Sequence, residues 1–220
     1  MKKWCLCLAF IVMATTRGWA VPTIHGATGL IMVPTAESLQ YKQFNMGIDY
    51  VYGDIPKNDG LYYKANLGTF KSWELGIVGG KVPTEGVFVN VKYYLMSDNE
   101  RFPLAIAIGS ENLFSKDSTD VYMVASKKFQ GGIGVHLGFK ALFQKDELVP
   151  SIMGGAEYVL SNQWSVLADF NGERKKYMVN AGVRYFAWDD LSVNLSVLDI
   201  GHTVYTAPLY SIGVSYTKFL

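Results

Sequence analysis

Cysteine is nearly absent from this chain of 220 residues, and Cys5 and Cys7 are its only two. Both lie in an N-terminal segment that we predict to be removed on export, so residues 21–220 can form no disulfide. Small exported domains with a weak core usually depend on disulfides. The mature chain must therefore be stabilised in some other way.

Long apolar runs and an excess of charge of one sign are also missing. No stretch of residues 21–220 approaches the roughly 18 apolar residues that a transmembrane helix needs. Removal of residues 1–20 leaves 17 basic and 19 acidic residues, a formal net charge of −2. This balance argues against a nucleic-acid partner and against a polybasic membrane patch. What the sequence does contain is 14% aromatic residues and 22 glycines, which favours β structure.

Residues 1–20 are predicted to form a secretory signal peptide. Lys2 and Lys3 give it a positive start, Trp4–Ala14 are largely apolar, and small residues precede an expected cleavage site after Ala20. The apolar region is too short to span a bilayer as a helix. We therefore expect export through the inner membrane of a Gram-negative cell.

Hydrophobic periodicity predicts strands in the mature chain. Apolar and polar or small residues alternate without exception through Ile133–Ala141, and the same alternation recurs in Val87–Leu95, Tyr177–Tyr185 and Leu191–Val197. About ten residues is the length with which a tilted strand crosses a bilayer. The predicted strands lie at residues 43–53, 61–70, 73–81, 86–96, 103–113, 118–129, 132–143, 149–161, 164–172, 176–188, 191–200 and 208–220.

These strands predict an all-β fold, a transmembrane antiparallel up-and-down β-barrel of 12 strands over residues 43–220, with 14 strands as the alternative. The expected connections alternate between short turns, such as Asp98–Glu100, and longer links, such as Gln144–Leu148 and Asn171–Lys176. Short turns are periplasmic in outer-membrane barrels. An even strand count then predicts the cell outer membrane as the location, with both termini in the periplasm.

One face of each predicted strand is apolar and should meet lipid, while the other face is polar. A barrel of 12 strands is wider than the eight-stranded kind that side chains fill, so water or a plug should occupy its lumen. Four acids against four bases favour a network of pairs or a weakly selective passage. The polar residues expected to face the lumen are Asp49, Lys64, Glu74, Lys92, His136, Lys140, Glu157, Asp169 and Arg184.

Catalytic chemistry has little support in the sequence. His136 facing Asp169, or His202 near Asp199, could serve an outer-membrane lipid or peptide hydrolase, yet no nucleophile motif accompanies either histidine. Three scattered histidines without cysteine predict no metal site, and no cofactor is expected. The favoured hypothesis is a non-enzymatic outer-membrane barrel, with an outer-membrane hydrolase and a soluble periplasmic β protein as alternatives.

Residues 21–42 break the strand pattern and form a separate N-terminal segment. We expect Thr23–Leu39 to lie in the lumen or the periplasm, with one helical turn at Thr35–Leu39 after Pro34. Its distinctive residues are Gly26, Thr28, Gly29, Leu30, Pro34, Thr35, Ala36 and Leu39. In these residues the segment resembles the N-terminal signature of the YjbH-like family of outer-membrane proteins.

The resemblance implies an outer-membrane envelope protein of a family linked to exopolysaccharide or capsule secretion, here as a short, single-barrel member. Passage of small solutes, or a structural barrel without transport, are the other roles considered. The expected partners are outer-membrane lipid and lipopolysaccharide, the barrel-assembly machinery and, through the resemblance, envelope polysaccharide. An aromatic-rich final strand, ending in Phe219 and Leu220, resembles the signal that this machinery reads.

Overall fold

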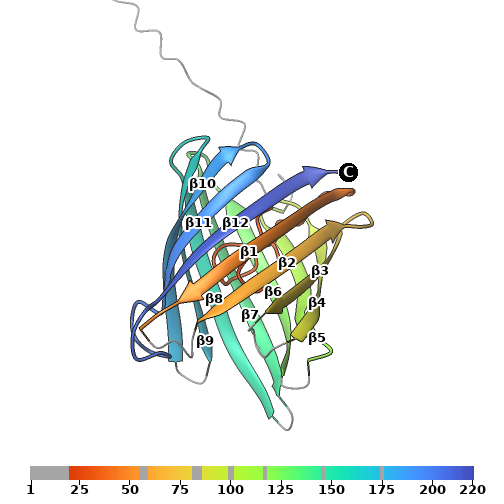
Figure 1. The fold of residues 1–220 in the computed structure, drawn as a ribbon. Helices are drawn as coiled ribbons and strands as arrows, with labels where there is room; N and C mark the ends of the chain where they lie inside the picture. Colours follow the sequence, from red (N-terminus) through yellow and green to blue (C-terminus); the bar gives the residue numbers. More distant parts are fainter. Residues whose placement is uncertain are drawn as a thin grey trace, which may run out of the picture.

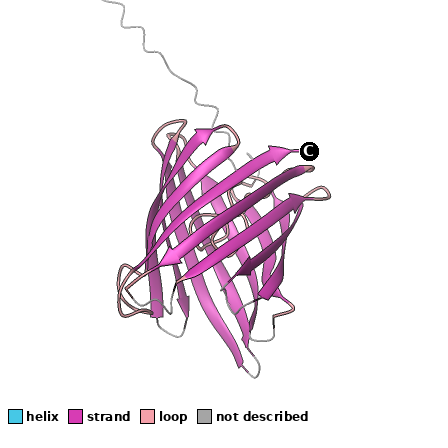
Figure 2. Cartoon of the chain, in the orientation of Figure 1, coloured by secondary structure: helices cyan, strands magenta, loops and turns pink. Residues whose placement is uncertain are grey.

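The computed structural model describes residues 20–54, 59–80, 86–98, 102–115, 118–144, 147–173 and 176–220. The predicted signal peptide therefore lies outside the described residues, apart from Ala20. The structure contains strands joined by loops (Figure 2). Within the described ranges, no helix has the length and apolar character needed to cross a membrane.

The 12 predicted strands are confirmed, each with bounds within two residues of those expected from periodicity. They are β1 (Gln43–Tyr52), β2 (Gly60–Gly68), β3 (Trp73–Gly80), β4 (Gly86–Met96), β5 (Ala105–Leu113), β6 (Ser118–Lys128), β7 (Ile133–Gln144), β8 (Glu147–Val159), β9 (Trp164–Glu173), β10 (Lys176–Trp188), β11 (Leu191–Leu198) and β12 (Leu209–Phe219).

These strands form one closed antiparallel barrel (Figure 1). Each strand pairs with its neighbours in sequence, and β1 closes the barrel against β12 in a register that runs from Gln43 opposite Phe219 to Tyr52 opposite Tyr210. Closure satisfies the backbone groups that an open sheet edge would leave unpaired. The start of β1 and the end of β12 share one end of the barrel, here called the near rim, and the opposite end is the far rim.

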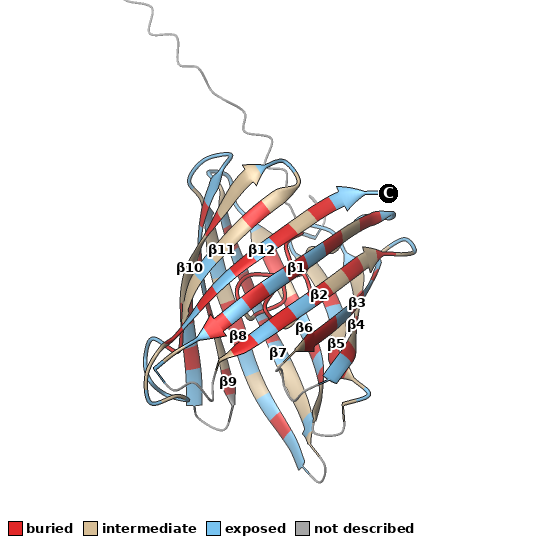
Figure 3. Ribbon diagram, viewed as in Figure 1, coloured by how far each residue is buried: buried red, intermediate tan, exposed pale blue. Residues whose placement is uncertain are grey.

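Burial alternates along each strand, so that bands of buried and exposed residues follow one another (Figure 3). On β7, Val135, Leu137 and Phe139 are exposed on the outer surface, whereas His136 between them is buried inside the barrel. Successive side chains of a strand point to opposite faces of the sheet. The apolar set therefore faces outward, as expected in lipid, and the polar set faces the lumen.

The links between strands differ from the expected alternation of lengths. Gln144 pairs with Glu147, and Glu173 pairs with Lys176, so only two residues join each of these strand pairs where longer loops were expected. The link from β4 to β5, expected to be a short turn, instead spans residues 97–104. The prediction was wrong because polar residues at a strand end can continue the ladder beyond the apolar band. Loop length therefore does not orient this barrel.

Candidate functional site: the lumen and its N-terminal segment

Residues 20–40 lie inside the barrel, where Figure 1 shows them as a red and orange loop enclosed by the strands. Isolated bridges join Pro22 to Thr28 and Gly29 to Pro34, and the segment adds no thirteenth strand to the wall. Most of its side chains are buried. We call residues 20–40 the lumen segment.

The helical turn expected at Thr35–Leu39 does not form. Side chains of the barrel wall bind several of its backbone groups instead. Ala36 donates its N–H to Ser126 Oγ at 2.9 Å, and Leu39 donates its N–H to Glu74 Oε2 at 3.0 Å. A wall that supplies these partners removes the need for helical hydrogen bonds.

Glu74 and Lys92, neighbours across β3 and β4, hold the centre of the lumen segment. Glu74 accepts the N–H of Thr28 at 3.0 Å and its hydroxyl at 2.8 Å. Lys92 donates to the carbonyl oxygens of Thr28 at 2.8 Å and Glu37 at 2.7 Å. The side chain of Lys92 is 1% exposed and that of Glu74 is 2% exposed, and Lys92 Nζ lies 3.8 Å from Glu74 Oε2. Each is therefore the charge partner of the other in a buried site.

Asp169 and Arg184 hold a tight turn of the segment from the opposite side of the lumen. One carboxylate oxygen of Asp169 accepts three successive backbone N–H groups, from residues 31–33, at 2.9, 2.7 and 3.0 Å. Arg184 donates to the carbonyl oxygens of Gly29 at 3.3 Å and Leu30 at 3.0 Å. Consecutive N–H groups form a concave anion site, and the wall fills this one with a carboxylate.

Further donors bind the first turn of the segment. These wall-to-segment bonds run from Asn45 to the carbonyl oxygen of Ala20 at 2.8 Å, Lys64 to that of Thr23 at 2.5 Å, Asn66 to that of Gly26 at 2.7 Å and Asn90 to that of His25 at 2.8 Å. Gly26 has a φ of 105°, and a Cβ there would lie 2.6 Å from the Asn90 amide. Glycine is therefore required for this approach.

Apolar side chains of the segment pack against inward-facing apolar residues of the wall in two clusters. The first joins Ile24, Leu30 and Ile31 to a set that includes Leu167 of β9. The second joins Val33 and Ala36 to wall residues that include Tyr122 and Val124 of β6. Burial of apolar area stabilises the seated segment at roughly 25 cal/mol per Å². The lumen thus holds the segment by both polar and apolar contacts.

The structure places all nine of the polar residues expected in the lumen on the inner face, but it distributes them among different partners. Five of them bind the lumen segment, as described above: Lys64, Glu74, Lys92, Asp169 and Arg184. Asp49 pairs with Lys64. Lys140 instead pairs with Glu111 and Asp120, and Glu157 lies 3.7 Å from Lys128.

Two acids and one base on the inner face were not among the expected residues: Glu111, Asp120 and Lys128. Asp120 follows the same alternation as Tyr122 and Val124 on β6, so an exhaustive count along that strand would have found it. With these three added, the inner-face residues named above are six acids and five bases.

The histidines do not form the pairs considered for a hydrolase. His136 Nδ1 lies 2.7 Å from Ser126 Oγ, the atom that also accepts the Ala36 N–H. The carboxylate oxygens of Asp169 and Asp199 are bound by backbone and amide N–H groups. Burial, followed by the charges of two lysines, lowers the pKa of His25 to about 3. That the chain is not an enzyme stays a prediction.

Titration of Glu37 should reveal the ion pair that holds the C-terminal end of the lumen segment at the near rim. Lys128 lies 3.1 Å from Glu37. Burial opposes ionisation, but the charges of Lys128 and His136, together with side-chain hydrogen bonds from Thr35 and Lys128, outweigh it, and the pKa of Glu37 falls to about 2 from 4.5. This interaction therefore stabilises the fold above about pH 4.5 and is lost as the pH falls toward 2. In Lys128→Met, we expect carbon-13 NMR to report a Glu37 pKa closer to 4.5.

Lys127→Met is the matched control, because Lys127 pairs with Asp98 at 2.8 Å rather than with Glu37. An unchanged Glu37 pKa in Lys128→Met would show that the pair does not hold the segment.

Several inner-face side chains at the level of the segment are inaccessible to water. Lys92 is 1%, His136 2% and Asn180 0% exposed. Side chains that line an aqueous channel present their polar ends to water, as in porins. Around these side chains the segment therefore fills the lumen.

Comparison with known proteins shows similarity in structure only. No protein-family model matches the chain, and no curated protein matches it. Among solved structures, the KdgM porin aligns with a TM-score of 0.62 at 14% identity over 80% of this chain and 99% of its own. The NanC porin gives 0.62 at 14% identity over 79% and 98%. The comparisons do not support the YjbH-like family, and at this identity they show the fold alone: the chain has the barrel fold of these porins.

Proposed function

We propose that this protein is an outer-membrane channel for small solutes whose lumen segment closes the passage. The observation that carries the proposal is the burial of charged lumen residues against a segment of the same chain. Glu74, Lys92, Asp169 and Arg184 bind the backbone of that segment where a pore would present them to solute. The segment must be displaced for passage to occur.

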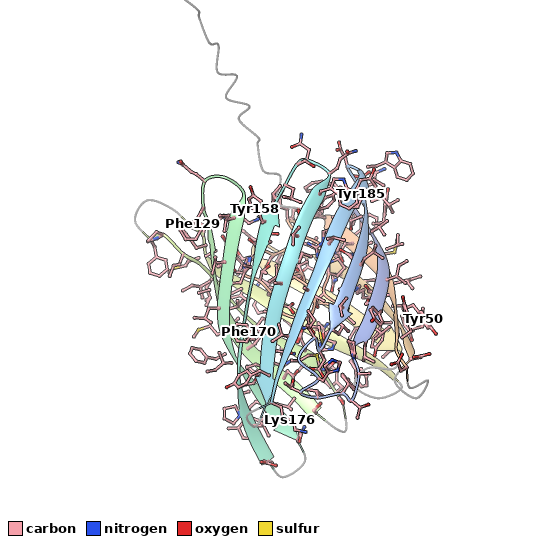
Figure 4. The ribbon with its side chains drawn as sticks, turned by 90° about the vertical axis from the view of Figure 1, so that its left-hand side faces the viewer. Tyr50, Phe129, Tyr158, Phe170, Lys176 and Tyr185 are labelled. Atoms are coloured by element: carbon pink, nitrogen blue, oxygen red, sulfur yellow. The ribbon has the colours of Figure 1, made fainter. Side chains whose placement is uncertain are left out.

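The outer surface supports placement in a bilayer. Aromatic pairs lie near both rims, as in the girdles of transmembrane barrels. Near-rim ring centroids are 4.7 Å apart for Trp73 and Tyr93, and 4.6 Å for Trp164 and Tyr185. At the far rim Tyr52 stacks on Tyr210. Figure 4 shows Tyr158 and Tyr185 toward one end and Tyr50 toward the other.

The proposed orientation places the near rim in the periplasm, with both termini, and the far rim outside the cell. The even number of strands and the shared rim of β1 and β12 put both termini at the same end of the barrel. That this end is the periplasmic one is part of the proposal. In this orientation the outer surface meets phospholipid on the periplasmic side and lipopolysaccharide on the other. We also propose that the barrel-assembly machinery inserts the chain.

Envelope polysaccharide is the narrower cargo that the sequence resemblance suggests. The inner face supports a saccharide only in general terms, since carboxylates, ammonium groups and amides can all bind hydroxyl groups. The experiment that follows therefore tests the passage of small ions, without regard to a saccharide.

Deletion of residues 21–40 should convert a barrel of low conductance into an open channel. We expect the purified full chain to show little single-channel conductance in planar bilayers, and the deletion variant to show large, long-lived openings, because the segment no longer fills the lumen. Heat-modifiable gel migration verifies that both barrels are folded. Equal conductance of the two folded proteins would refute the proposal.

A further inference from the structure

The loop between β11 and β12, residues 199–208, is held in the same way as the lumen segment: a carboxylate accepts consecutive backbone N–H groups. Asp199 is fully buried, and its carboxylate accepts the N–H groups of Thr203 at 3.0 Å, Val204 at 2.9 Å and Tyr205 at 2.6 Å. Burial raises the pKa of Asp199, but these N–H groups outweigh it and lower the pKa overall. The loop at the far rim is therefore folded around one carboxylate, as the turn at residues 31–33 is folded around Asp169.

A continuous chain of hydrogen bonds joins the two carboxylate sites. Asp199 donates its backbone N–H to Asn180 Oδ1 at 3.0 Å. Asn180 donates its side-chain amide to Asp169 Oδ1 at 2.8 Å. The other oxygen of Asp169 accepts the three N–H groups of the turn at residues 31–33. Asn180 is 0% exposed, so water does not compete for its two bonds.

Apolar contacts provide a second connection between the loop and the segment. Tyr205 of the loop packs against the buried cluster that contains Ile24, Leu30 and Ile31 of the segment. Leu198 and Leu209, which flank the loop, belong to the same cluster. Displacement of the loop would thus expose segment residues to water and remove support for Asn180 at the same time.

We propose that the Asp199–Pro208 loop is a latch for the lumen segment, so that opening of the loop at the far rim releases the turn at residues 31–33. The effect on conductance rests on the proposed channel function, but the coupling itself does not. Coupling of this kind is reciprocal: if opening of the loop favours release of the turn by a given factor, release of the turn favours opening of the loop by the same factor. A ligand that binds the open loop would then favour the open lumen.

Hydrogen exchange of the full chain in detergent micelles, read by mass spectrometry, tests the latch. In Asp199→Ala we expect amide exchange at residues 31–33 to rise by about tenfold or more, within the usual range for coupled sites. Those amides do not contact Asp199, so a purely local role would speed exchange only at residues 203–205. The matched control is Asp59→Ala, which removes another far-rim carboxylate that binds a backbone N–H, that of Gly53 at 3.0 Å.

Faster exchange at residues 203–205 with an unchanged rate at residues 31–33 would overturn the latch. If Asp199→Ala does not fold, the reverse experiment decides: a disulfide between Ala36→Cys and Ser126→Cys should slow exchange at residues 203–205. An unchanged loop rate after cross-linking would also overturn it. If exchange rises at residues 31–33 in Asp199→Ala while conductance stays unchanged, the latch stands and the channel proposal fails.

Discussion

Asp169→Ala is expected to raise the ratio of open to closed channels by roughly 100-fold. The substitution leaves three N–H groups of residues 31–33 without an acceptor and removes the acceptor of the Asn180 amide. Hydrogen bonds to a charged group contribute about 1.5–3 kcal/mol each, and a net loss of about 3 kcal/mol corresponds to this ratio. Open probability in planar bilayers measures it directly.

Asp98→Ala is the control for this experiment. Asp98 forms a partly exposed ion pair with Lys127, and such pairs contribute about 0–1 kcal/mol. The control should therefore gate as the unmodified protein does. An Asp169→Ala channel with the open probability of Asp98→Ala would mean that the turn at residues 31–33 does not hold the segment closed.

Lys92→Met should lower the free energy of unfolding by about 3–5 kcal/mol, the usual cost of breaking a buried charge pair. The ammonium group binds the carbonyl oxygens of Thr28 and Glu37 and lies 3.8 Å from Glu74, and methionine replaces none of these interactions. Urea unfolding of the barrel in lipid vesicles, followed by heat-modifiable migration, gives the value.

A double-mutant cycle with Glu74→Gln separates the charge pair from the other contacts of Lys92. Because the second substitution removes the unpaired carboxylate, the double variant should lose less stability than the sum of the two single variants. Additive losses would show that Glu74 and Lys92 act independently. Lys127→Met, at a partly exposed position, should change the free energy by no more than about 1 kcal/mol.

Periodicity predicted the barrel wall well because lipid and lumen impose opposite demands on alternate residues. On β10, Val179 and Val183 face outward while Asn180 and Arg184 face inward, and this contrast is visible in the sequence alone. The links were less predictable, since polar residues such as Gln144 and Glu147 can pair as strand beyond the apolar band.

The identities of the motif residues in the N-terminal segment are explained by their contacts inside the lumen. A Cβ at Gly29 would lie 2.3 Å from the Val33 carbonyl oxygen, so the turn that binds Asp169 requires glycine there. Thr28 bonds to Glu74 through both its N–H and its hydroxyl, and Ala36 is fully buried. The sequence showed that these residues were unusual, but their partners lie up to 155 positions away and could not be predicted from spacing.

The relay through Asn180 could not be predicted either. Of its two partners, Asp169 lies within β9 and Asp199 directly follows β11. A lumen asparagine on an alternating strand looks the same in the sequence whether or not it joins two sites. Only the register of β9 and β10, which sets Asn180 opposite Asp169, brings the three groups together.

A reversible cross-link within the lumen tests the central claim most directly. Ala36 N and Ser126 Oγ lie 2.9 Å apart, and residues 21–220 contain no cysteine, so Ala36→Cys with Ser126→Cys introduces one defined disulfide. In an Asp169→Ala background, we predict that single-channel conductance disappears on oxidation and returns on reduction. Conductance that is the same in the oxidised and reduced states would contradict closure of the lumen by its own N-terminal segment.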